Sequence, residues 1–376
     1  MNTTIQKTHI VKDLFAFILI VFMSYILQDF LIPILFAILL SVLVYPIVKL
    51  FETRLCFNRI VSIVIAILIF TIIIFVIFVA IGIQFQDIMD KSDTYYDKIL
   101  EKLNILIKET ENSTGIESED IVGTDKLEVK EIVKQNSNKI LDFITRSGSV
   151  ISDFLFTPLY MFFLLLYRNF LISFLYKATA RISTKKSMRA ILSQLYKVQQ
   201  NYLVGLVSVM GIVGLLNSIG LLALGIDYPF FFGFLCALLL LVPYIGIIIG
   251  SLLPALVALA IKDSYWYAIG VIAIFGFIQF IEGNFITPKI TGSKVSLNSF
   301  VSILAILLFS MLWGIPGMIL ALPITASLKV LFDNSQKFKP IGFVLGQADE
   351  KYFCSKAKNR LKIWKKIRKN KSKELQ

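Results

Sequence analysis

The chain has few of the residues that build metal or cofactor sites. Its 376 residues include three cysteines (Cys56, Cys236 and Cys354) and one histidine, His9. Cysteines this scattered indicate neither a disulfide framework nor a clustered zinc site. A phosphate-binding loop and a His-Glu-x-x-His motif are also missing from the sequence. We therefore expect no enzymatic activity, no cofactor and no bound metal.

Charge is also scarce, and apolar residues take its place. Only 17% of the residues are charged and 57% are hydrophobic, against roughly 45–50% apolar residues in a soluble domain. This composition excludes a water-soluble globule and a disordered chain. A helix needs about 20 mostly apolar residues to cross the hydrocarbon core of a bilayer. Continuous apolar runs predict an all-α polytopic membrane protein with about eight segments, namely Leu14–Leu27, Leu31–Val48, Ile60–Ile83, Gly148–Tyr167, Tyr202–Ile226, Tyr228–Ile261, Ser264–Ile281 and Val295–Leu328.

The runs and the polar stretches between them divide the chain into four regions. Residues 1–83 hold the N-terminal membrane segments, the first two joined by a tight hairpin over Gln28 and Asp29. Residues 84–147 have the periodicity of two amphipathic helices and are expected to form an external helical hairpin. This hairpin is interpreted as a solvated cap or, alternatively, as a lid or subunit contact, so homo-oligomer formation stays open. Residues 148–332 form the transport core, and residues 333–376 a tail.

The distribution of charge predicts the orientation. The 84–147 segment carries nine basic and fourteen acidic residues, whereas residues 168–200 carry seven basic residues and no acidic one. The 333–376 tail carries thirteen basic and four acidic residues. Basic loops stay on the cytoplasmic side, which places both termini inside and the 84–147 segment outside. The amphipathic inner loop and the tail are expected to contact anionic lipid headgroups, and nothing in them favours a nucleic-acid partner.

The runs Tyr228–Ile261 and Val295–Leu328 are too long for simple spans. Each has 34 residues and as a straight helix would reach roughly 51 Å, beyond the ~30 Å core. Proline and glycine interrupt both, and broken helices in a membrane mark the binding sites of transporters. Whether the runs are kinked single spans or re-entrant hairpins stays open, as does a purely structural role. The interrupting residues are Pro243, Gly246, Gly250 and Pro254 in the first run, and Gly314, Pro316, Gly317 and Pro323 in the second.

Acidic residues in apolar surroundings are the candidate solute or ion contacts. Glu282 follows an unbroken apolar run and is followed by Asn284. A carboxylate near a span needs a partner or water, so Glu282 is interpreted as a proton or cation site, as an interfacial helix end, or as the partner of Lys289. Asp153 is the other acidic residue within a predicted span. The stretch after Glu282 is further broken by Pro288 and Gly292.

Four motifs together resemble the autoinducer-2 exporter family of bacterial membrane proteins. The resemblance runs from Pro33 to Phe332 and is most specific over residues 200–332. The motifs are Tyr202-Leu203-x-Gly205, then Pro243-Tyr244-x-Gly246 with Pro254, then EGNFITPKITGSKVSLNSF, and finally Gly314-x-x-Gly317 with Leu322-Pro323 before Leu328-Lys329-Val330-Leu331.

The resemblance implies seven or eight membrane segments and a location in the bacterial plasma membrane. Export of a furanosyl signal and sodium/proton antiport have both been attributed to members, so it implies no single substrate. The family's asparagine-proline pattern matches Asn284 and Pro288, but Thr287 stands where an acidic residue often precedes the proline. We therefore expect a secondary transporter that moves a small solute or exchanges cations. A non-transporting membrane scaffold and a gated channel are the alternatives.

Overall fold

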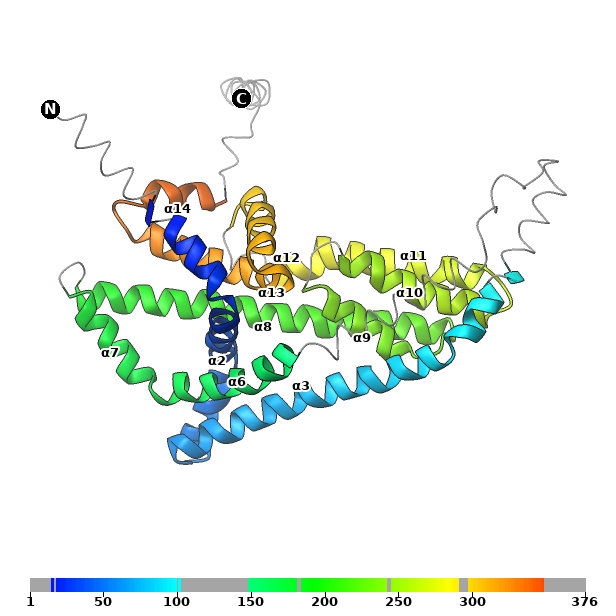
Figure 1. Ribbon diagram of the computed structural model, residues 1–376, viewed down its shortest axis with the longest axis horizontal. Coiled ribbons are helices and arrows are strands. Elements are labelled where there is room, and N and C mark those ends of the chain that lie inside the picture. The colour runs from blue at the N-terminus through cyan, green and yellow to red at the C-terminus, as the bar shows by residue number, and fades with distance from the viewer. Residues whose placement is uncertain are drawn as a thin grey trace, which may run out of the picture.

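A computed structural model of the chain describes residues 15–16, 18–99, 101–102, 148–180, 184–241, 245–290 and 297–347 (Figure 1). These residues are helical apart from turns and one isolated bridge between Leu297 and Gly346, which confirms the all-α class for them. The helices are α2 (Gln28–Arg54), α3 (Arg59–Asp90), α6 (Gly148–Leu166), α7 (Arg168–Ala178), α8 (Lys185–Ala223), α9 (Pro229–Leu239), α10 (Ile245–Ile261), α11 (Trp266–Ile281), the π-helix η2 (Glu282–Ile286), α12 (Thr287–Ile290), α13 (Ser299–Asp333) and α14 (Lys339–Leu345).

Several features expected from the sequence lie outside the described residues. They include most of the 84–147 hairpin, of which residues 103–147 fall in the undescribed part, and the basic tail from residue 348 onward. Pro243 and Gly292 lie outside it as well.

Five described helices are long and apolar enough to cross a membrane, so the chain is a multi-pass membrane protein. A sixth candidate is Phe156–Leu166 together with Arg168–Ala178, two helices bent by 67°. The described residues thus support five or six spans, whereas the sequence predicts about eight segments. The five candidates are Gln28–Arg54, Arg59–Asp90, Lys185–Ala223, Trp266–Ile290 and Ser299–Asp333.

The expected tight hairpin over Gln28 and Asp29 is wrong. Both residues lie in the first turn of α2, and among the described residues before them Leu27, with φ −92° and ψ 17°, interrupts the helix. The Leu27 N–H donates to the Met23 carbonyl and the Leu31 N–H donates to the Leu27 carbonyl. Helical hydrogen bonds therefore continue through Leu27. The chain bends there and does not reverse at Gln28 and Asp29.

The two largest of three apolar clusters among the described residues pack most of the helices together. The first joins α2, α3 and α6 around Val44, Ile63 and Met161, which are all buried. The second joins α8, α9, α10 and α11 around Phe232 and also includes Ile88 near the end of α3. Figure 1 shows α3 running obliquely below α8, from α2 and α6 toward α9 and α10. The long α3 helix therefore connects the two clusters.

The first long run folds back on itself. Its two helices, α9 and α10, pack so closely that a Cβ atom at Gly250 would lie 2.6 Å from Cys236 Sγ. A Cβ atom at Gly246 would lie 2.6 Å from the Leu239 carbonyl carbon. Gly246 contacts Leu239, and Gly250, further along α10, contacts Cys236, further back in α9. The two helices are therefore antiparallel. The glycines thus serve the helix contact, since any side chain there would separate the two backbones.

The two ends of this run lie near the same end of α3. Tyr228, before α9, accepts a hydrogen bond from Lys91 Nζ at 2.6 Å. Lys102 Nζ donates to the Leu259 carbonyl at 2.9 Å and to the Lys262 carbonyl at the end of α10. A single straight crossing would separate Tyr228 and Lys262 by more than the ~30 Å core. Lys91 and Lys102 are only eleven residues apart, yet they contact the two ends of the run. The run therefore forms a hairpin.

The second long run also reverses direction. Gly314 has φ 62° and ψ −138° inside α13, a conformation essentially restricted to glycine. Beyond it, a Cβ atom at Gly317 would overlap the Phe309 carbonyl oxygen, eight residues earlier. In a straight helix these two residues would be about 12 Å apart. The Trp313 indole N–H, just before the break, donates to the Ser24 carbonyl at 2.9 Å. Figure 1 shows α13 turning at its middle.

Both ends of α13 lie close to α14. The Asn298 N–H, before α13, donates to the Leu345 carbonyl at the end of α14 at 2.9 Å. At the other end of α13, Asp333 packs against Gly342 of α14, where a Cβ atom would lie 2.9 Å from the Asp333 nitrogen. Because α14 has only seven residues, about 10 Å of helix, α13 begins and ends in the same part of the molecule.

Candidate functional site

A cavity of about 350 Å³ lies between α8, the end of α9, η2 and α13. Most of its wall is apolar, which is typical of a small-molecule site with a few placed polar groups. The polar lining residues are Tyr202, Glu282, Thr287, Ser302 and Gln347. The apolar lining residues are Leu206, Val209, Leu240, Leu241, Leu297, Ile306, Met318, Ile319 and Leu322.

The cavity is built where the two long runs break. Leu240 and Leu241 line it directly after α9 ends. Met318 and Ile319 line it shortly after the non-helical Gly314. Non-helical backbone at membrane depth is tolerated only where protein or a water-filled cavity covers it. The breaks that the sequence predicts therefore lie beside the cavity.

Glu282 is the acidic residue of the cavity. Its half-buried carboxylate accepts a hydrogen bond from Gln279 Nε2 at 2.6 Å and another from Thr287 Oγ1. Within the described residues, no ion pair joins it to Lys289, which is exposed. Two neutral donors hold the carboxylate in place, and no basic side chain of the described residues pairs with its charge. An uncompensated carboxylate in a largely apolar cavity is suited to attract a cation or a proton.

The backbone around Glu282 has an unusual local form. Residues 282–286 form a π-helix, in which the Thr287 N–H donates to the Glu282 carbonyl. Pro288 follows one residue later and cannot donate a backbone hydrogen bond of its own. A π-helical turn widens the helix by one residue and recurs at functional sites. Here it carries Thr287 round to the carboxylate, so the threonine that departs from the family's acidic pattern is a direct partner of Glu282.

The other residues predicted for the site lie elsewhere. Asn284 is exposed and does not line the cavity, and its amide donates to the Phe280 carbonyl at 2.9 Å. Asp153 belongs to α6, and its side chain is outside the described part. Gly246 and Gly250 lie at the α9–α10 contact, and Gly317 lies at the α13 reversal. Pro254 and Pro323 are fully buried, Pro316 follows the α13 break, and Pro288 is exposed.

Other polar residues at helix contacts were not singled out from the sequence. Buried Gln199 on α8 donates to the Pro323 carbonyl and to Ser327 Oγ, both at 2.7 Å, and so ties α8 to the second half of α13. Arg59 joins α3 to α6, and Arg168 joins α7 to α2, in the same way. Interhelical hydrogen bonds of this kind stabilise membrane helix packing. A lone polar residue in an amphipathic run gives no sequence signal for such a role.

Comparison with known proteins identifies the family of the chain. Residues 14–337 match the family model described as AI-2E family transporter. YrrI of Bacillus subtilis, named as a transport protein, is 36% identical over 162 residues, 42% of this chain and 45% of YrrI. The AI-2 transport protein TqsA of Escherichia coli is 26% identical over 150 residues, 40% of this chain and 43% of TqsA. The chain thus matches under half the length of these relatives.

Proposed function

Because the chain belongs to the AI-2E transporter family, we propose that it is a secondary transporter whose solute or ion passes through the Glu282 cavity. The observation that carries the proposal is this carboxylate, held by Gln279 and Thr287 in a cavity bordered by both broken runs. Interrupted helices around a polar site are the general design of secondary transporters. The cargo is a small solute or a cation. TqsA carries the name of an AI-2 transport protein, which makes that signal one solute to test.

We place the transporter in the bacterial plasma membrane with the basic C-terminal tail cytoplasmic. The basic 168–200 loop and the basic tail support this orientation. Both long runs are taken as re-entrant hairpins, the first entering from outside and the second from inside. The contacts of Lys91 and Lys102 with the two ends of the first run support the first hairpin. With these two hairpins, α2, α3, α6, α8 and α11 cross in alternation. Because the chain does not reverse before α2, this odd number of crossings puts the N-terminus on the outer side, opposite the tail.

Two exposed positions distinguish hairpins from single crossings. In hairpins, Asp263 between α10 and α11 faces outside and Ser299 at the start of α13 faces inside; single crossings reverse both. In a cysteine-free background, Asp263→Cys should therefore react with an impermeant thiol reagent in intact cells, and Ser299→Cys only after lysis. Gln336→Cys is the control, because it faces inside in either topology. Labelling of Ser299→Cys in intact cells would contradict the hairpins.

Flux in proteoliposomes tests the function itself. Purified full-length protein is reconstituted and supplied with proton or sodium gradients and a panel of labelled solutes that includes AI-2. A secondary transporter gives solute movement that depends on one of the gradients. A gated channel would give solute movement that ignores them, and a membrane scaffold would give none, so either outcome overturns the proposal.

A further inference from the structure

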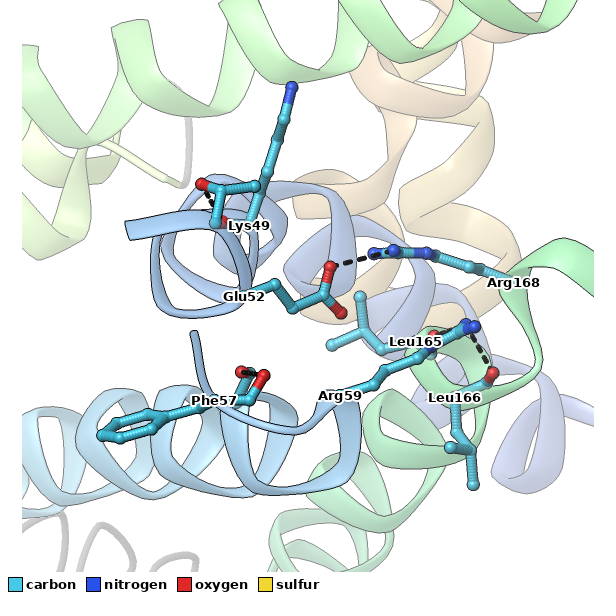
Figure 2. Close-up of polar contacts among 9 residues, drawn as sticks. Lys49, Glu52, Phe57, Arg59, Leu165, Leu166 and Arg168 are labelled. Atoms are coloured by element: carbon cyan, nitrogen blue, oxygen red, sulfur yellow. Dashed lines mark hydrogen bonds and ion pairs between the residues drawn. The ribbon is translucent and has the colours of Figure 1, made fainter. Parts of the chain in front are cut away.

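A second polar site lies where α6 bends into α7, and it shares no lining residue with the Glu282 cavity. Arg59 Nη2 donates to the Leu165 carbonyl at 2.8 Å and to the Leu166 carbonyl at 2.5 Å, the last carbonyls of α6 (Figure 2). These carbonyls have no helical partner of their own, so the arginine caps the helix. Arg168, the first residue of α7, reaches the other way, and its Nη2 lies 3.1 Å from Glu52 Oε2 of α2 (Figure 2).

Beside Arg168 is a pocket of about 570 Å³ between α2, α7 and the start of α8, here named the basic pocket. Its wall includes Ser41, Tyr45, Arg168, Arg189 and Ser193. Among the described residues, two buried polar atoms of this wall have no hydrogen-bond partner, Ser41 Oγ and Arg168 Nη1. Ser41 is only 7% exposed. Buried polar atoms without a partner are rare and call for a ligand or water.

The basic pocket continues into an apolar groove of about 700 Å³, since Leu164 and Leu171 line both. The groove has almost no polar wall, and its other lining residues are Ile34, Tyr160, Phe163, Tyr167 and Phe170. Phe170 is 70% exposed, so the groove opens to the surroundings of the protein. A charged end and an apolar end are thus joined in one continuous surface.

The charge of the basic pocket selects the kind of occupant. Glu52 faces one side of Arg168, and the Arg168 guanidinium also lies 4.9 Å from the centre of the Tyr45 ring. Arg189 makes no hydrogen bond or ion pair within the described residues, and the 168–200 stretch contains no acidic residue. Arginine is the side chain best suited to bind a phosphate group. Basic pockets between membrane helices on the inner side bind lipid headgroups.

We propose that the basic pocket and the apolar groove together bind one anionic phospholipid. The lipid phosphate lies between Arg168 Nη1 and Arg189, within reach of Ser41, and an acyl chain lies along the groove past Leu171. A soluble phosphate would leave the apolar groove unfilled, and an uncharged amphipath would leave Arg189 without an opposite charge. The bound lipid fixes the bend between α6 and α7 and so holds the inner loop against the bilayer.

The binding test uses the full-length protein in detergent with three probes. They are a short-chain phosphatidylglycerol, phosphatidylcholine with the same chains, and glycerol 3-phosphate, each titrated and followed by native mass spectrometry. Phosphatidylglycerol should bind about tenfold more tightly than phosphatidylcholine, because only the first keeps a net negative charge for the two arginines. Glycerol 3-phosphate should bind much more weakly than phosphatidylglycerol, because it has no acyl chain.

Variants locate the binding. Arg189→Gln should weaken phosphatidylglycerol binding about fivefold, in the range of a partly exposed ion pair. Lys186→Gln removes the same charge from an exposed position of the same stretch that does not line the pocket, and should leave binding unchanged. Leu171→Trp, on the shared wall, should weaken lipid binding without changing the binding of glycerol 3-phosphate.

Three results would overturn the lipid site. Equal loss of binding in Lys186→Gln and Arg189→Gln would mean that diffuse surface charge attracts the lipid. Glycerol 3-phosphate that binds as tightly as the lipid would identify a soluble anion as the ligand. Equal binding of phosphatidylcholine and phosphatidylglycerol would remove the role of the arginines.

Discussion

Gly317→Ala is expected to open the α13 reversal and to lower the free energy of unfolding by about 3 kcal/mol, the upper range for overpacking. The added methyl group would overlap the Phe309 carbonyl oxygen, lie 2.7 Å from the carbonyl carbon and 3.1 Å from Trp313 Cβ. Two of these atoms belong to the backbone, which cannot rotate away as a side chain would. Thermal unfolding of the purified variant in detergent measures the loss.

Gly276→Ala is the control for Gly317→Ala. Gly276 lies in α11, and a Cβ atom there would have no neighbour within 4 Å. The same chemical change should therefore leave the unfolding temperature unchanged or slightly raised, since alanine favours a helix. If Gly317→Ala unfolds at the same temperature as Gly276→Ala, the close approach of residues 309 and 317 is not present in the protein.

Glu282→Gln is expected to leave the fold intact and to reduce gradient-driven flux about tenfold or more, within the range of a coupling free energy of 1–3 kcal/mol. Glutamine has the shape of glutamate and still accepts a hydrogen bond from Gln279 or Thr287 through its carbonyl oxygen. It does not carry the charge that would bind a proton or cation. Flux in proteoliposomes and thermal unfolding are measured on the same preparations.

Two further variants distinguish the proposed ion-binding role of Glu282 from a role as the partner of Lys289. Asn284→Ala alters an exposed residue two positions away that does not line the cavity, so flux should be unchanged. Lys289→Gln added to Glu282→Gln should restore neither flux nor stability, because no ion pair joins the two residues. Restored stability in the double variant would establish the Lys289 pair instead. Unchanged gradient-driven flux in folded Glu282→Gln protein would end the ion-site proposal.

Local patterns in the sequence predict the all-α class, whereas the described residues support five or six spans in place of the predicted eight or so membrane segments. Continuous apolar runs specify membrane helices, and glycine and proline within them predict where the two long runs are interrupted. Glu282 is predictable as a polar site because a carboxylate next to an apolar run is costly without a partner. The bend at Leu27 is not predictable in this way, because the adjacent Gln28 and Asp29 are turn-forming in water but form the first turn of α2 here.

The features that the sequence does not predict are those that depend on contacts between segments far apart in the chain. The contact that holds the end of the first run comes from Lys102, which donates to the Lys262 carbonyl at the end of α10, 160 residues later. The polar lining of the cavity depends on Tyr202, Ser302 and Gln347 coming together from three separate parts of the chain. None of these residues stands out locally, since serine, tyrosine and glutamine are common at helix surfaces. The sequence predicts Asn284 as a site residue because it lies two positions from Glu282, but the π-helical turn brings Thr287 to the carboxylate.

Chemical block of the Glu282 cavity tests most directly whether it is the transport pathway. Ser302 lines the cavity from α13, and Ser310 lies on the same half of α13 without lining it. In a cysteine-free background, a thiol reagent bound to Ser302→Cys should fill much of the roughly 350 Å³ and abolish gradient-driven flux in proteoliposomes. The same reagent on Ser310→Cys should leave flux unchanged. Full flux through protein labelled stoichiometrically at Ser302→Cys would contradict the account, because the solute or ion would then pass elsewhere.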